Sequence, residues 1–430
     1  MGLFKSKVAA NASWIIIGKI AQSMIALIVN MFTARYLGPS NYGLISYAAS
    51  IVAFAVPLMN LGFANILVQE YTNFPEDEGK ITCTSICFSA VSAVACIVGI
   101  VSFSASVNSG ETQTTIVVFL YSILLIFQAF ELIQYWFQAK LLSKYMAIIS
   151  FGVYCIIACY KILLLVLKAS INWFAISNAV EFFLIATCLY ISYRKLGGQK
   201  LQFSLMVGKR MFARSKHYII SSLMVTIFAQ TDKVMLKAMI DETAVGYYSA
   251  AVSCAGMTSF VFGAIIDSFR PAVFQYQKKG DFQGYEKCLQ RLYSIVIYVA
   301  LIQSLCMTIL AKYIIRILYG TEFIPAVLAL QIVVWYTTFA YMGSVRNIWI
   351  LGENKQKYLW ILNLAGALLN IILNALLINL YGLYGAAVAS LITQFFVNVV
   401  MNVVIWPLRH NNTLILRGLN LRNIIELIKR

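Results

Sequence analysis

Long apolar stretches separated by short polar breaks run along the whole chain, and each stretch is about as long as a helix that crosses a lipid bilayer. A helix rises about 1.5 Å per residue, so roughly 20 apolar residues span the hydrocarbon core. The pattern therefore predicts an all-α, polytopic integral membrane protein. We expect twelve transmembrane helices, at residues 9–34, 43–66, 81–105, 114–138, 145–167, 173–193, 217–239, 244–268, 292–311, 324–350, 358–379 and 383–406.

The two halves of the chain resemble each other. Residues 37–43, Leu-Gly-Pro-Ser-Asn-Tyr-Gly, align with residues 240–246, Ile-Asp-Glu-Thr-Ala-Val-Gly, and further on Trp136 aligns with Trp349 after about ten extra residues in the second half. Six spans per half is an even number, so both halves have the same orientation and are related by an axis along the membrane normal. We expect an N-terminal six-helix bundle at residues 1–193, a cytoplasmic amphipathic linker at 194–216, a C-terminal six-helix bundle at 217–406 and a basic cytoplasmic tail at 407–430.

Composition and charge agree with a membrane protein. The chain is 61% hydrophobic and only 11% charged, which lies outside the range of soluble globular proteins. The net charge of +17 could suggest nucleic acid as a partner. However, most Lys and Arg residues fall in the termini and inner loops, as the positive-inside rule requires when both termini are cytoplasmic. We therefore expect membrane lipid and no nucleic acid as a partner.

Two polar segments on the expected inner side of the membrane carry charge of opposite sign. The linker at 194–216 interleaves basic with apolar residues, which is typical of a segment that lies on anionic lipid. The acidic loop at 75–80 is expected to be solvated. The sequence contains no nucleotide-binding, nucleophile-elbow or zinc-protease motif and no C-x-x-C pair, so we expect no enzymatic activity, no cofactor and no metal site.

Charged and amide side chains within the N-terminal spans are candidates for function. Lys19 should lie about 15 Å deep, where a cation needs water or a partner, although it could also snorkel or pair with a structural carboxylate. The fourth span carries Gln128, Glu131, Tyr135 and Gln138 on one helical face, which should line a cavity. Glu131 either carries protons or only pairs with Lys19. Lys161 and Glu181 lie at similar depth, and we favour an internal salt bridge.

The C-terminal spans carry a second polar set. Thr226, Gln230 and Lys233 share a helical face, while Asp232 points about 100° away, so that each charge needs a partner on another helix, a ligand or water. The later spans carry two rows of amides, one containing Asn370. These amides either join helices or face a polar ligand such as a sugar.

Several motifs resemble those of a known family. They are Asn11-Ala-Ser-Trp14, Ala34-Arg-Tyr-Leu-Gly-Pro-Ser-Asn-Tyr-Gly43, Gln230-Thr-Asp-Lys233 and Val245-Gly-Tyr-Tyr248. With them the chain resembles the Wzx-type oligosaccharide flippases, in the polysaccharide transport branch of the multidrug/oligosaccharidyl-lipid/polysaccharide exporter superfamily. The resemblance implies a MATE-like fold of two six-helix bundles around a cavity that opens alternately to each side. It also implies translocation of an undecaprenyl-diphosphate-linked oligosaccharide, from the cytoplasmic to the outer leaflet of a bacterial plasma (inner) membrane.

That substrate suggests roles for the polar residues in the spans. A cationic lumen is typical of such proteins and would be supplied by Lys19, Lys161 and Lys233. Gln22, Gln138, Gln230 and Asn370 would meet sugar hydroxyls, and Glu131 and Asp232 would couple transport to an ion. One alternative is a drug/cation antiporter of the same superfamily, which would favour acidic rather than basic groups. Another is a scaffold that recruits a polysaccharide polymerase or other assembly proteins.

Overall fold

The computed structural model describes the backbone of residues 2–420, together with the side chains of residue 22 and of residues 25–420. This part of the chain consists of helices joined by short turns, which confirms the predicted all-α fold. The chain forms two compact units, Met1–Gln230 and Thr231–Arg430, called unit 1 and unit 2 below. The predicted bundle boundaries at residues 193 and 217 concern membrane topology, and they stay predictions.

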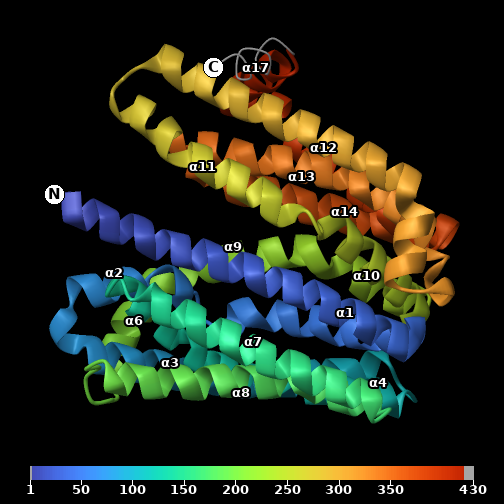
Figure 1. Cartoon of the computed structure of the whole chain (residues 1–430), viewed down its shortest axis with the longest axis horizontal. Helices are drawn as coiled ribbons and strands as arrows, with labels where there is room; N and C mark the ends of the chain where they lie inside the picture. The colour runs from blue at the N-terminus through green and yellow to red at the C-terminus, as the bar shows by residue number, and fades with distance from the viewer. Residues whose placement is uncertain (1, 421–430) are drawn as a thin grey trace. The chain divides into compact units, whose positions relative to one another are not determined.

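Unit 1 is a bundle in which α7 packs against both α1 and α8, and α4 packs against α1, α3 and α8 (Figure 1). Its buried core at one end of the bundle is rich in aromatic side chains, among them Phe63, Trp136, Phe137 and Tyr193. The helices of unit 1 are α1 (Gly2–Met59), α2 (Leu67–Asn73), α3 (Glu78–Val107), α4 (Thr112–Ser122), α5 (Leu124–Gln128), η3 (Ala129–Ile133), α6 (Gln134–Ala139), α7 (Ser143–Val166), α8 (Ile171–Lys195) and most of α9 (Leu205–Met239).

Unit 2 is a second helical bundle, in which α12 and α13 pack along each other and α15 packs against α13 and α14. The C-terminal α17 packs on α12, where the Tyr293 hydroxyl donates a 2.7 Å hydrogen bond to Asn411 Oδ1. The helices are α10 (Glu242–Gly256), α11 (Ser259–Lys278), α12 (Phe282–Leu318), α13 (Ala326–Gly352), α14 (Leu359–Tyr381), α15 (Leu383–Phe395), the π-helical η6 (Phe396–Val400), α16 (Met401–Val404) and α17 (Arg409–Gly418).

All twelve predicted spans fall on these helices. In the described part of the chain, ten helices are long and apolar enough to cross a membrane, and α10 with α11, bent by 40°, make an eleventh. The first predicted span and most of the second lie on the single long helix α1, which ends at Met59 and whose backbone leaves the helical conformation at Gly38 (φ 72°, ψ 173°). The multi-pass architecture predicted from hydropathy is therefore confirmed.

The two halves break their helices at aligned positions but with different chemistry. Gly38 has a positive φ that suits glycine, and Pro39 disfavours helix at the residue before it. At the aligned position, Asp241 is extended (φ −167°, ψ 178°), and its Oδ1 accepts a 2.7 Å hydrogen bond from the backbone N–H of Ala244, which caps α10. The sequence repeat thus corresponds to a repeated helix break.

The acidic loop at 75–80 is not simply solvated, which corrects the expectation from sequence. Glu78 is 4% exposed, forms an ion pair with Lys140, and accepts a 3.0 Å hydrogen bond from Trp136 Nε1. Asp77 pairs with Lys80 at 2.9 Å and with Arg210 at 3.9 Å. Apart from Lys80, these partners are distant in sequence, so the loop joins the ends of several helices.

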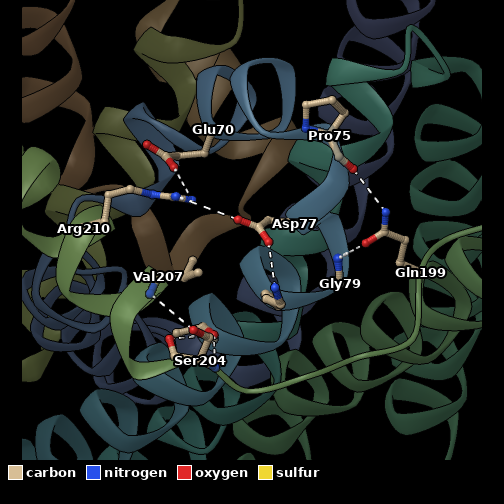
Figure 2. A network of polar contacts seen from close by, with 10 residues as sticks. Glu70, Pro75, Asp77, Gly79, Gln199, Ser204, Val207 and Arg210 are labelled. Atoms are coloured by element: carbon tan, nitrogen blue, oxygen red, sulfur yellow. Dashed lines mark hydrogen bonds and ion pairs between the residues drawn. The ribbon is translucent and has the colours of Figure 1, made fainter.

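The basic linker is bound to unit 1 by this loop and by α2. Glu70, fully buried on α2, forms ion pairs with Arg210 and Arg214 of α9, and Figure 2 shows Arg210 between Glu70 and Asp77. The side chain of Gln199 accepts a 3.0 Å hydrogen bond from Gly79 N–H and donates one of 3.1 Å to the carbonyl of Pro75 (Figure 2). Part of the positive charge is therefore neutralised within the protein. Large apolar side chains of the same segment are exposed and remain available to lipid, at Phe203, Leu205, Met206 and Phe212.

A second contact fixes the C-terminal end of α1 to α9. The chain turns through Leu61 (φ 49°) and Gly62 (φ 70°), and Ser215 Oγ donates a 2.7 Å hydrogen bond to the carbonyl of Leu61. A Cβ on Gly62 would lie 2.5 Å from the carbonyl oxygen of Ser215. Close backbone approach and a positive φ therefore both require glycine here.

Candidate functional site

The carboxylate of Asp232 lies in a polar cage in unit 2. Asp232 is 6% exposed, and its Oδ2 accepts hydrogen bonds of 2.5 Å from the hydroxyls of Tyr248 on α10 and Ser390 on α15. Its Oδ1 accepts bonds of 3.0 and 2.7 Å from the side-chain amides of Asn370 and Asn374 on α14. Four donors from three helices stabilise the negative charge inside a membrane-spanning bundle.

The cage joins two residues that the sequence singled out for different roles. Asp232 was predicted as an ion-coupling group and Asn370 as a sugar ligand, yet the Asn370 amide donates to Asp232. Sequence reasoning missed Tyr248 and Ser390 as partners. Tyr248 lies in the Val245-Gly-Tyr-Tyr248 motif of the family resemblance, which was a usable signal, whereas nothing in the sequence distinguished Ser390.

Lys233 follows Asp232 on α9 and is half-buried. The two opposite charges interact electrostatically, but the four hydrogen bonds to Asp232 come from other helices. Lys233 therefore contributes to the charge balance of this region.

A second polar site lies in unit 1, where two carboxylates line one cavity of about 210 Å³. Glu131 from η3 and Glu181 from α8 share it with the amides of Gln22 and Gln134 and with Ser150 and Tyr154 of α7. Gln22 and Glu131, both predicted site residues, are thus brought together. Lys161 on α7 interacts electrostatically with Glu181 on α8, and the two helices pack together; an internal salt bridge between them stays a prediction.

The predicted face of the fourth span is kept only in part: Gln128 interacts with Glu131 as predicted, but Gln134 does so as well and lines the cavity. The regular helix expected at 114–138 is replaced between Ala129 and Ile133 by the 3₁₀ helix η3. A 3₁₀ helix has three residues per turn, so Gln134 lies on the same side as Glu131, one turn later. Gln138, predicted to share the face of Glu131, is half-buried on α6 and is not among the described residues that line this cavity.

A third feature is a larger cavity of about 500 Å³ between the second half of α1 and α9, within unit 1. The predicted sugar ligand Gln230 lines it at one end of its α9 wall, and Gln230 Oε1 accepts a 3.1 Å hydrogen bond from Ser50 Oγ. Asn60, Ser222 and Thr226 also line it. The remaining predicted cation, Lys19, is on α1, and its side chain lies outside the described residues.

Outside the membrane-spanning helices, one buried hydroxyl has a shifted pKa. Burial raises the pKa of Tyr71 on α2, so this hydroxyl stays protonated near neutral pH. It shares a 2.9 Å hydrogen bond with Thr82 Oγ1 of α3. The contact is structural and belongs to the core that supports the Glu70 ion pairs.

Comparison with known families identifies the chain. Residues 8–277, more than half of its length, match the family described as polysaccharide biosynthesis protein. The chain belongs to this family. Residues 218–376 also match the family MatE. Both matches confirm, at family level, the predicted resemblance to the polysaccharide flippases of the multidrug/oligosaccharidyl-lipid/polysaccharide exporter superfamily.

Two solved structures share the fold. A multidrug resistance MATE family transporter of the MOP superfamily, in an inward-facing conformation, is 13% identical with a TM-score of 0.71 and covers 93% of this chain and 98% of that chain. The lipid II flippase MurJ, in an inward closed conformation, is 14% identical with a TM-score of 0.71 and covers 96% of this chain and 92% of that chain. At such identities the likeness establishes the fold alone, and it confirms the predicted MATE-like architecture.

A curated relative gives a partial match. The probable low-salt glycan biosynthesis flippase Agl15 of Haloferax volcanii is 23% identical over 195 residues. The match covers 45% of this chain and 41% of that protein, so the chain spans about two-fifths of the length of this relative. The match is consistent with the family and assigns no individual residue.

Proposed function

We propose that this protein is a flippase that moves an undecaprenyl-diphosphate-linked oligosaccharide from the cytoplasmic to the outer leaflet by alternating access. The family match over residues 8–277 carries the proposal. The expected location is the plasma (inner) membrane of a bacterium, where a polysaccharide polymerase and other assembly proteins would use the translocated lipid. No catalytic residue is needed, because the proposed step changes only the position of the substrate.

The physical requirement for such a protein is a polar path inside the membrane. Moving a diphosphate and a glycan through hydrocarbon without hydrogen-bond partners is prohibitive. The two cavities of unit 1 provide polar walls among helices that are otherwise apolar. The lipid tail can remain in the bilayer while the head group uses these walls.

Ion coupling is proposed at Asp232, with Glu131 as a second candidate. The donors around Asp232 come from α10, α14 and α15, so movement of any of these helices changes the cage and with it the affinity of the carboxylate for a proton or a monovalent cation. Asn370, first predicted to bind substrate, would then support coupling. Such a site converts an ion gradient into a bias between conformations.

The remaining predicted residues keep their proposed substrate roles. Lys19, Lys161 and Lys233 are our candidates for contact with the diphosphate. Gln22, Gln138 and Gln230 are our candidates for contact with the glycan. Of these, Gln22 and Gln230 line the described cavities.

A drug/cation antiporter is a second candidate function, because residues 218–376 match MatE. Its substrates would be organic cations and not diphosphate lipids. Acidic groups such as Glu131 and Glu181 in the smaller cavity are compatible with a cation. The two functions therefore differ in the charge of the substrate, which an assay can decide directly.

The deciding experiment measures both activities with one preparation. Purified full-length protein is reconstituted in liposomes with a polyprenyl-diphosphate disaccharide in one leaflet, and its arrival in the other is measured with a membrane-impermeant lectin. A parallel sample follows efflux of a fluorescent organic cation under a proton or sodium gradient. Lipid translocation above that of protein-free liposomes supports the flippase. Cation efflux without lipid translocation would replace it with the antiporter.

A further inference from the structure

The α1–α9 cavity has the size and the location of a ligand site. Its volume of about 500 Å³ lies within the range of roughly 300–1,000 Å³ that is usual for small-molecule sites. Most of its walls are half-buried or exposed side chains, and Val225 is 48% exposed, so a ligand can reach them. The lining residues are Ala53, Val56, Pro57, Asn60, Gly62, Ala64, Asn65, Ser221, Ser222, Val225, Thr226, Ala229 and Gln230.

With the expected topology, the cavity extends from the inner ends of the helices toward the middle of the membrane. Ser221 and Gln230 mark its two ends on α9, and nine residues of helix correspond to about 14 Å. Its inner end is formed by the turn at Leu61 and Gly62, which Ser215 holds by the hydrogen bond to Leu61. One end is therefore fixed, and the long axis follows the direction of the proposed transport.

The walls are polar but neutral. Asn60, Asn65 and Gln230 supply amides, and Ser221, Ser222 and Thr226 supply hydroxyls, between apolar surfaces of valine, proline and alanine. Among the described side chains that line this cavity, none is charged. The smaller cavity of unit 1, by contrast, is lined by two carboxylates.

This combination matches an uncharged sugar better than an anion. Sugars present hydroxyls that exchange hydrogen bonds with amides and hydroxyls, and C–H surfaces that pack on apolar side chains. The Thr226 hydroxyl donates to the Ser222 carbonyl at 3.1 Å, and its oxygen can still accept a bond. A carboxylate or diphosphate would lose its hydration here without gaining an opposite charge.

We infer that the α1–α9 cavity is a subsite for the uncharged sugar residues of the substrate, separate from whatever cations hold the diphosphate. This inference rests on the proposed flippase function. It implies that the sugars in this position are neutral hexoses or N-acetylhexosamines and not uronic acids. Substrate selection by the glycan would then occur largely in unit 1.

The test compares two synthetic substrates in the liposome assay. Both are short-chain polyprenyl-diphosphate disaccharides, and they differ only in the distal sugar, which is a neutral hexose in one and the matching hexuronic acid in the other. The wild type is expected to translocate the neutral lipid about tenfold faster, the factor that one desolvated, unpaired charge readily causes. Equal rates for the two substrates would overturn the inference.

Charge-introducing variants test whether this cavity sets the preference. Thr226→Lys should reduce the preference for the neutral lipid to near one or reverse it, and Ser222→Lys, one turn away, repeats the test if the first variant folds poorly. Thr187→Lys is the matched control, because the exposed Thr187 on α8 also bonds back to its own helix, through a 2.8 Å hydrogen bond to the Phe183 carbonyl. An unchanged preference in well-folded Thr226→Lys and Ser222→Lys would show that selection lies elsewhere.

The outcomes separate the two proposals. If the wild type translocates the neutral lipid but shows no preference, the flippase stands and the neutral subsite fails. If it translocates neither lipid while the preparation is folded and monodisperse, the flippase fails, and the subsite inference falls with it. If the wild type prefers the neutral lipid, and Thr226→Lys removes this preference while Thr187→Lys keeps it, both proposals are supported.

Discussion

The hydroxyl of Tyr248 lies 2.5 Å from Oδ2 of Asp232 and joins α10 to α9 across a hairpin whose turn is capped by Asp241. Ser390 Oγ lies 3.0 Å from the same hydroxyl and also donates to Oδ2. The carboxylate therefore connects the hairpin to the last long helices of unit 2. A change in its occupancy by a proton or cation would be felt by several helices at once.

Replacing Asp232 with Asn should reduce translocation and remove its dependence on the driving ion. The amide keeps the shape of the carboxylate but carries no charge, and its nitrogen would face hydroxyl and amide groups that now donate to Oδ1 or Oδ2. We expect initial translocation rates to fall by about 10- to 100-fold, because the substitution removes a charge to which four side chains donate hydrogen bonds. Rates are measured in liposomes at several imposed proton and sodium gradients.

The matched control is Asp267→Asn. Asp267 on α11 is exposed and pairs with Arg270 at 3.0 Å on its own helix, so the same substitution there should leave the rate and ion dependence unchanged. An Asp232→Asn protein that still responds to an ion gradient as the wild type does would remove Asp232 as the coupling group. Glu131→Gln would then be the next variant to assay.

The large-scale fold was predictable because the hydropathy and the length of each helix depend only on residues that are close together in the sequence. Each predicted span needed only its own residues, and the aligned breaks at Gly38 and Asp241 follow from glycine, proline and a capping carboxylate within a few positions. Contacts between distant segments were not predictable in this way. Glu70 meets Arg214 across 144 residues, and no local pattern marks that pair.

The candidate sites were predicted in part for the same reason. Polar residues inside apolar spans identified Asp232, Glu131 and Gln230, but not their partners. The 3₁₀ turn at Ala129–Ile133 changed which residues accompany Glu131, since helical-face arguments assume 3.6 residues per turn. The roles of Asn60 and Asn65 depend on a turn that ends α1, which only the structure shows.

Replacing Glu70 with Gln should destabilise the protein. Glu70 is fully buried and forms ion pairs with both Arg210 and Arg214, so the neutral variant leaves two guanidinium groups without their shared counter-charge. These arginine side chains are 31% and 37% exposed, and solvent will offset part of the loss. We expect a cost of about 2 kcal/mol. Thermal unfolding in detergent measures it.

Glu76→Gln controls for removal of a negative charge from the same region. Glu76 is exposed in the loop beside Asp77, and its replacement should change the unfolding temperature very little. Equal unfolding temperatures for Glu70→Gln and Glu76→Gln would mean that the ion pairs of Glu70 contribute nothing measurable to stability.

Replacing Gly62 with Ala should be more damaging than the same change in an open position. Gly62 has φ 70°, and a Cβ would lie 2.5 Å from the carbonyl oxygen of Ser215. We expect about 2–4 kcal/mol of destabilisation from backbone strain and steric conflict together. Gly99→Ala on α3 is the control, because its Cβ would meet nothing within 4 Å, and it should be neutral or slightly stabilising. Similar unfolding temperatures for the two variants would contradict a fixed inner turn.

Lysines inside the spans should attract the diphosphate of the substrate if the lumen is cationic. Lys19→Ala and Lys233→Ala should each slow translocation of a diphosphate-linked lipid about tenfold, because each removes one charge from the path of a dianionic group. Lys312→Ala is the control. Lys312 is exposed on α12 at the expected outer side of the membrane, and its removal should not change the translocation rate.

The phosphate dependence distinguishes this role from a structural one. If the two lysines bind the diphosphate, their variants should lose more rate with a diphosphate lipid than with the matching monophosphate, since the lost attraction scales with substrate charge. A structural lysine would lower both rates equally and would also lower the unfolding temperature. Folded variants that translocate both lipids at the wild-type rate would exclude these lysines from the substrate path. That result would not bear on the inference that the α1–α9 cavity binds neutral sugars.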